Sequence, residues 1–244
     1  MQGRLKTILV ILTLSTLSFG ETIINYSPIS NETWTLDGSP YRIRANVTID
    51  NLTIEPGVTV LFDGDYKFDV NDKLIAEGFY SDSIYFRPSP ENNNGWQGIN
   101  FKKGLLTSSL SYCRIDSSRT FGITIDNCSP VIRNCRIVNN KAYGIWVKDC
   151  LINLTHCIIA NNNSTGIFLD PGKVIASNLV IAQNNGYGIF STDTNDSLYL
   201  CNVTVIADSP NVGIYCETKK VFIKNSIIYG NINSIISSVN NLIL

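Results

Sequence analysis

Apolar and polar residues alternate along most of the chain, so that every second side chain falls on the same side. In the stretch "GIWVK", Ile145 and Val147 share one side and Trp146 points to the other. The stretches "GITID", "GIFLD" and "GIYCE" repeat this pattern, and short apolar stretches such as "CRIV" and "LVIA" precede the glycines. The alternation predicts short β-strands joined by polar corners, and no stretch after residue 20 has a helical stripe.

The predicted strands recur with a nearly constant period. The glycine that opens each stretch occurs at Gly98, Gly122, Gly144, Gly166, Gly188 and Gly213, in steps of 24, 22, 22, 22 and 25 residues. Ser234 continues the series 21 residues later. A period that tolerates small insertions predicts a solenoid in which each repeat is one turn stacked on the previous turn.

Stacked strand–bend–strand turns that bury Ile, Val and Leu predict an all-β fold, a single-stranded parallel β-helix. The usual handedness of parallel crossovers predicts the right-handed form. We expect about ten coils and a rod roughly 45–50 Å long, because parallel strands lie about 4.8 Å apart.

Two sets of residues at constant spacing are expected to form columns inside this helix. Asn140, Asn162 and Asn184 are predicted to form a ladder of side-chain amides along one bend, within a chain that contains 28 Asn. Cysteines form the other column, at Cys113, Cys135 and Cys157. Because the chain has seven Cys, at least one thiol is unpaired within a monomer, and both stacked core thiols and disulfides between neighbours remain open.

Composition along the chain predicts a series of segments. Basic residues followed by a short apolar run are typical of a secretory signal peptide, which makes the mature protein secreted or attached to the cell surface without a membrane span. The final "NNLIL" looks like the start of another strand, so we expect an incomplete C-terminal end, covered by a partner or by a missing domain. The expected segments are 1–20 signal peptide, 21–44 N-terminal cap and 45–244 β-helix, the last with early coils at 45–105 and regular repeats at 106–236.

Charge and composition argue against two classes of partner. The net charge is −1 with acids and bases mixed, so the chain lacks the basic stripe that nucleic-acid binding requires. The absence of a C-x-x-C pair and the presence of a single His, His156, argue against a zinc site. A lone His is interpreted as a bend or core residue.

Several stretches resemble a known group of proteins. "LTIEPGVTVLFDG", "KLIAEG" and "GWQGINF" look like the opening coils of exported bacterial β-helix proteins, and "VIRNCRIVNNKAYGIWV" resembles their later repeats. The chain therefore resembles the pectin-lyase-like superfamily, specifically its right-handed parallel β-helix repeat proteins. This resemblance implies the fold but no single activity, because the group includes lyases, hydrolases, adhesins and proteins without known activity.

An aromatic residue stands two positions after four of the glycines, and the alternation points it outward. These residues are Trp146, Phe168, Phe190 and Tyr215. An exposed strip of rings can stack against the apolar faces of sugar rings or contact a protein. The alternative is that the rings stack on each other and are covered by a loop, the cap or a missing domain.

Acidic residues follow the same strands and are candidate calcium ligands. They are Asp126, Asp149, Asp170, Asp193 and Glu217. Carboxylates on neighbouring coils can bind Ca²⁺. In the superfamily that the chain resembles, lyases use such clusters together with an arginine base. Aspartate is also an ordinary residue of solvated turns, and Lys148 interrupts the row.

Arg114 and Arg136 fall at one offset in successive repeats and are candidate contacts for the carboxylate of a uronic acid. Nothing in the sequence places them near the acidic row. The sequence also lacks the paired Asp and Gly-His-Asp motifs that mark pectin-hydrolysing β-helices.

Three functions are compatible with these patterns. The first, which the short corners favour, is a non-catalytic exported protein that presents a rigid face to glycans or surfaces. The second is a polysaccharide lyase or glycoside hydrolase acting on an acidic polysaccharide, and the third is a structural spacer of a larger surface protein. The sequence assigns no catalytic residue and leaves the question of enzymatic activity open.

Overall fold

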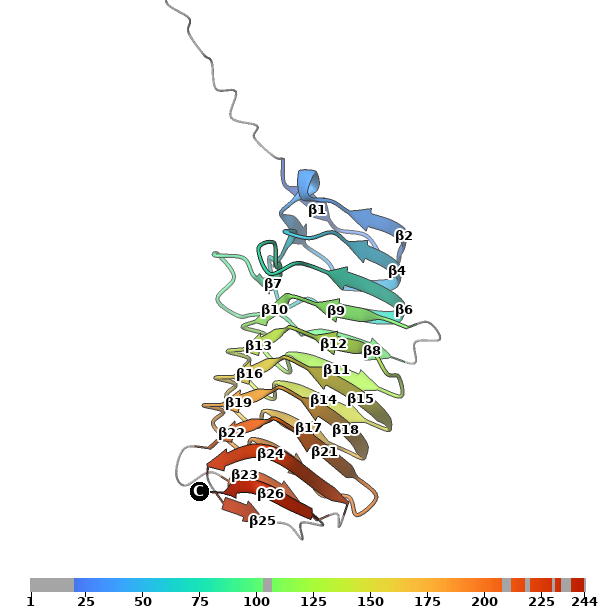
Figure 1. The fold of residues 1–244 in the computed structure, drawn as a ribbon. Helices are drawn as coiled ribbons and strands as arrows, with labels where there is room; N and C mark the ends of the chain where they lie inside the picture. The colour runs from blue at the N-terminus through green and yellow to red at the C-terminus, as the bar shows by residue number, and fades with distance from the viewer. Residues whose placement is uncertain are drawn as a thin grey trace, which may run out of the picture.

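The structure is a computed structural model that describes residues 20–102, 107–207, 212–217, 220–229, 231–233 and 238–243. The chain winds into stacked turns that form an elongated rod, with β1 at one end and β25 and β26 at the other (Figure 1). Residues 1–19 of the predicted signal peptide, and Ser234 of the glycine series, lie outside the described residues.

Each turn contributes strands to three faces of the rod, and each strand pairs in parallel with its equivalent one turn later. The first face contains β1 (Thr22–Ile24), β3 (Tyr41–Ile43), β5 (Thr59–Phe62), β7 (Ile84–Pro88), β10 (Cys113–Asp116), β13 (Arg136–Val138), β16 (Ile158–Ala160), β19 (Val180–Ala182) and β22 (Thr204–Ile206).

The second face follows the first after a corner. It contains β8 (Ile99–Lys102), β11 (Ile123–Asp126), β14 (Ile145–Lys148), β17 (Ile167–Leu169), β20 (Ile189–Ser191), β23 (Val212–Cys216) and β25 (Asn231–Asn233). Except for β25, these strands begin beside one of the repeated glycines, as the periodicity predicts.

The third face completes the turn. It contains β9 (Ser109–Ser111), β12 (Val131–Arg133), β15 (Cys150–Thr155), β18 (Gly172–Ser177) and β21 (Ser197–Cys201). Five longer strands bend from one face to the next; they are β2 (Ile29–Trp34), β4 (Val47–Ile54), β6 (Phe68–Glu77), β24 (Val221–Tyr229) and β26 (Ser238–Ile243).

The predicted fold class is confirmed, because the described residues form a right-handed parallel β-helix of about nine turns, close to the ten expected. The predicted cap, residues 21–44, contains β1, β2 and β3, together with the 3-10 turn η1 (Leu36–Gly38). Because β1 pairs with β3 and β2 pairs with β4, this segment already includes the first coil of the helix. A capping role for it stays a prediction.

The corners between faces use the left-handed backbone conformation that Asn tolerates better than most residues. Between the third and first faces, one residue per coil has φ between 49° and 56°: Tyr112, Asn134, His156, Asn178, Asn202 and Asn225. His156 is therefore an exposed corner residue, in agreement with its predicted place in a bend.

The repeated glycines are required by close contact between coils. A Cβ added to Gly144 would lie 2.7 Å from the carbonyl oxygen of Gly166 and 2.8 Å from Nδ2 of Asn162. Both distances are shorter than van der Waals contact, so any side chain here would force neighbouring coils apart.

The predicted asparagine ladder is confirmed. Nδ2 of Asn140 donates to Oδ1 of Asn162 at 2.8 Å, and Nδ2 of Asn162 donates to Oδ1 of Asn184 at 2.9 Å. The backbone N–H of Asn140 also donates to Oδ1 of Asn162, at 3.1 Å. All three side chains are buried, so the ladder satisfies polar groups of a corner that the strands leave unpaired.

The cysteine column is part of the core. Cys113, Cys135 and Cys157 are buried with free thiols, and Leu179 and Val203 continue the column in the next two coils. Burial raises the pKa of the Cys135 thiol, which keeps it protonated. All seven cysteines lie in the described part of the chain and none forms a disulfide, which agrees with stacked core thiols in this column.

Candidate ligand-binding surface

The strands of the second face hold the predicted aromatic column in register. Their inward residues, such as Ile145 and Ile167, are fully buried. Between those inward positions, the outward side chains of neighbouring coils pair directly: Trp146 with Phe168, Phe168 with Phe190, and Phe190 with Tyr215. The structure therefore brings all four predicted ring residues together.

The four rings form a continuous stack along the rod axis. The ring centroids are 6.2 Å apart for Trp146 and Phe168, 5.5 Å for Phe168 and Phe190, and 5.2 Å for Phe190 and Tyr215. The last two pairs are nearly parallel, with interplanar angles of 21° and 26°. Contacts at these separations stabilise the ring arrangement beyond simple burial.

A second column of rings, which the sequence analysis missed, packs beside the first. Its members directly precede the glycines and are Phe121, Tyr143 and Tyr187. The ring centroids of Tyr143 and Phe168 are 4.9 Å apart, and those of Tyr187 and Phe190 are 4.5 Å apart. The signal was present, because an aromatic residue precedes Gly122, Gly144 and Gly188. We call the seven rings of both columns the aromatic strip.

The rings of the aromatic strip are partly exposed to solvent and partly buried. All seven rings are half-buried, and their contacts are mainly with one another. Nε1 of Trp146 is buried without a hydrogen-bond partner in the described part of the chain, because the surrounding rings offer no acceptor. Part of the predicted alternative is therefore correct, since the rings do stack on each other.

The acidic residues occupy more than one column, as their two offsets from the glycines imply. Asp126 lies opposite Lys102 and Lys148 on the neighbouring strands. Asp149 is one residue further along, at a corner with φ of 51°. The column beside the aromatic strip therefore alternates in sign, with Lys102, Asp126 and Lys148 in successive coils.

Of the three remaining acidic residues, two make local hydrogen bonds. Oδ1 of Asp193 accepts the backbone N–H of Asn195 at 2.7 Å. Glu217 accepts the hydroxyl of Tyr215 at 3.2 Å, and this hydrogen bond raises the pKa of Tyr215. Asp170 is exposed.

These positions do not fit a calcium ion. Among the described residues, no three His, Cys, Asp or Glu side chains are grouped closely enough to hold a metal. Calcium takes six or more oxygen ligands, which carboxylates in separate columns beside lysines do not supply. Calcium binding by the acidic row remains a prediction that the geometry does not favour.

The two predicted anion-binding arginines are in register on the first face, away from the aromatic strip. Arg114 is held by Asp116, with Nη2 at 2.6 Å from Oδ2. Burial acts to raise the pKa of Asp116, but hydrogen bonds from Ser117, Asn139 and Arg114 outweigh it and lower this pKa. Arg136 is exposed and makes no ion pair within the described residues.

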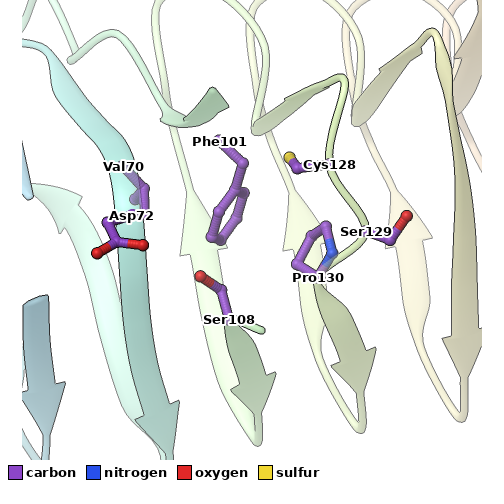
Figure 2. A pocket seen from close by; sticks show the side chains of 7 residues that line it. All are labelled: Val70, Asp72, Phe101, Ser108, Cys128, Ser129 and Pro130. Atoms are coloured by element: carbon purple, nitrogen blue, oxygen red, sulfur yellow. The ribbon is translucent and has the colours of Figure 1, made fainter. Parts of the chain in front are cut away.

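A small cavity lies where the second and third faces meet, but it is too small for a ligand. Figure 2 shows Asp72, Phe101 and Pro130 among the side chains around it. Its volume is about 10 Å³, near the space that a single water molecule occupies. Oδ1 of Asp72 is buried here without a hydrogen-bond partner among the described residues.

Comparison with known proteins agrees with this geometry. A family model described as a right handed beta helix region matches residues 30–172 and, in a second overlapping match, residues 97–243. No curated protein and no solved structure matches the chain. Within the described residues, no helix has the length and apolar character that crossing a bilayer requires. Fold and family match support a carbohydrate-related or surface β-helix protein and nothing more specific.

Proposed function

The chain belongs to the right-handed β-helix family, and from this premise we propose that it is an exported protein whose aromatic strip binds a glycan. The partner is a polysaccharide or another component of a cell surface. Binding is the whole function in this proposal, and no residue is assigned to catalysis.

One observation supports the proposal most directly, namely an aromatic strip that remains half-exposed along successive coils. Stacking uses part of each ring face, so a ligand meets ring edges and the exposed parts of the faces. Such a surface suits the apolar C–H faces of sugar rings. Because the strip follows the rod axis, a glycan chain can lie along it and contact several rings at once.

Polar groups next to the strip supply what sugar hydroxyls need. The hydroxyls of Tyr143, Tyr187 and Tyr215 are carried by the strip itself. The neighbouring column alternates between lysine and aspartate, as at Asp126 and Lys148, and therefore offers both donors and acceptors. Apolar rings beside alternating polar groups are typical of sites that position a ligand through a few hydrogen bonds.

Removing rings from the strip tests the proposal. The test uses a polysaccharide that retards the wild-type protein. We expect the variant Trp146→Ala/Phe168→Ala to bind this polysaccharide about tenfold more weakly than the wild type, because ring contacts are lost. The measurement is affinity electrophoresis through gels containing neutral or uronic-acid polysaccharides. The matched control is Phe79→Ala/Tyr80→Ala, which removes two rings that are 60% and 91% exposed outside the strip.

Three outcomes would overturn the proposal. Retention of the strip variant equal to that of the control would place binding elsewhere. No retention on any polysaccharide would favour the structural spacer. Release of unsaturated or reducing-end products would instead favour a lyase or hydrolase. Export is tested separately, by determining whether the secreted protein begins at Glu21.

A further inference from the structure

A groove on the third face lies apart from the aromatic strip. It crosses β18, β21 and β24 and has a volume of about 330 Å³, within the range of small-molecule sites. Its floor consists of three outward residues in register, Ile175, Tyr199 and Phe222. We call this feature the third-face groove.

The floor of the groove is apolar and partly exposed. Ile175 is 40% exposed and Phe222 is 37% exposed, which is unusual for residues at the centre of a sheet. The rings of Tyr199 and Phe222 stack at 4.7 Å with an interplanar angle of 12°, so their edges face outward. Ring edges carry partial positive charge and attract the negative face of another aromatic ring.

Cations stand at two opposite margins of the groove. Lys173 precedes Ile175 by two residues on its strand, and Nζ of Lys173 lies 4.7 Å from the Tyr199 ring centroid. Lys224 follows Phe222 by two residues and lines the groove. Neither lysine makes an ion pair within the described residues, unlike Lys102, whose Nζ lies 2.7 Å from Asp69.

Among the described residues, the strands around the groove carry no carboxylate that compensates these lysines. The outward positions of β12, β15, β18 and β21, and of β24 up to Lys224, carry no carboxylate. Arg133 on β12 adds another cation to this face, although it lies 3.5 Å from Glu77. The third-face groove is therefore positive and apolar at once.

We propose that the third-face groove binds small aromatic anions, such as aryl carboxylates or sulfonates. The ligand ring packs against the outward edges of Tyr199 and Phe222, and its anionic group lies beside Lys173 or Lys224. A sugar fits less well, because the apolar floor leaves most of its hydroxyls without partners. The site is independent of glycan binding by the aromatic strip.

Two fluorescent probes that differ only by an anionic sulfonate group test the assignment. We expect the full-length mature protein to bind 1-anilinonaphthalene-8-sulfonate about tenfold more tightly than the neutral N-phenyl-1-naphthylamine, because two lysines face the anion. The preference should be lost in Lys173→Gln/Lys224→Gln, and Phe222→Ala should weaken both probes. Lys148→Gln is the matched control, since it removes a lysine from the second face.

The aromatic strip serves as a second control. The variant Trp146→Ala/Phe168→Ala is expected to keep the preference for the anionic probe, whether or not it still binds polysaccharide. Equal affinity for both probes in the wild type would overturn the assignment. So would a preference that survives loss of both lysines or disappears with the strip rings. Displacement of the sulfonate by polygalacturonate would instead assign the groove to an acidic glycan.

Discussion

The early coils and the regular coils share one fold, but among the described residues only the early coils bury aromatic side chains inside the helix. In the early coils, here taken with the preceding segment as residues 21–105, seven rings are buried inside the helix: Trp34, Tyr41, Phe62, Phe68, Phe86, Trp96 and Phe101. From Leu110 onward the buried described residues include no aromatic side chain, and the rings of the aromatic strip lie outside. Aliphatic residues such as Ile145 fill the regular interior instead.

The difference follows from the regularity of the coils. Turns of equal length with a glycine at one fixed position produce a uniform cross-section, which a column of Ile, Val and Leu fills without gaps. Early coils differ in length, so their interior is uneven and larger rings fill it. Phe62 and Trp96, for example, stack at 4.0 Å across the core.

Ion pairs are concentrated in and next to the early coils. Asp63 binds both Arg42, at 2.7 Å, and Arg44, at 2.7 Å. Asp65 and Glu77 of the early coils likewise pair with Arg119 and Arg133 of the first regular coils. We infer that the early coils act mainly in stability, whereas the regular coils present side chains to partners.

Truncation of one ring in each region should give the largest difference in the loss of folding stability. Phe62→Ala removes a fully buried ring and is expected to destabilise the protein by about 3–5 kcal/mol. Phe168→Ala removes a half-buried ring and should cost about 1 kcal/mol. Urea denaturation of the mature protein measures both changes, and similar costs would contradict the division between the regions.

Interrupting the asparagine ladder should have the next largest effect, in the regular coils. Asn162→Ala leaves the backbone and side-chain N–H groups of Asn140 without their acceptor, and it removes one of the two donors to Oδ1 of Asn184. We expect a loss of about 3 kcal/mol, because several buried polar groups lose hydrogen bonds. The exposed neighbour Asn163 is the matched control, and Asn163→Ala should change the urea midpoint little. Equal effects would show that the ladder adds nothing to stability.

The smallest expected effect is a pH dependence that belongs to the early coils. Burial acts to raise the pKa of Asp63, but hydrogen bonds from Arg42 and Arg44 outweigh it and lower this pKa. A carboxyl with a lowered folded pKa stabilises the protein above its unfolded pKa, and this contribution disappears as the pH falls through the folded value.

Asp63→Asn should therefore cost about 1 kcal/mol at neutral pH and progressively less in acid. Thermal unfolding measured from neutral to acidic pH tests this, with the exposed Asp170→Asn in the regular coils as control. A difference between wild type and Asp63→Asn that stays constant with pH would contradict the assignment.

Some site residues could be read from the sequence and others could not. Trp146 and Phe168 were predictable because they lie exactly one period apart, so they must occupy equivalent places in adjacent coils. The arrangement of the acidic row could not be read from the sequence, because it mixes two offsets and one residue along a strand or corner moves a side chain to another column. The third-face groove went unseen because Ile175, Tyr199 and Phe222 are 24 and 23 residues apart, outside the main period.

By itself, the sequence determined the solenoid, its glycine and asparagine columns and its aliphatic interior. Repetition is enough for this, because residues one turn apart experience the same surroundings. Only the tertiary structure decided which rings of the early coils turn inward, that Asp126 lies between two lysines, and that the third face is positive. These features depend on how insertions at the corners shift one coil against the next, and such shifts are set by packing between residues distant in the chain.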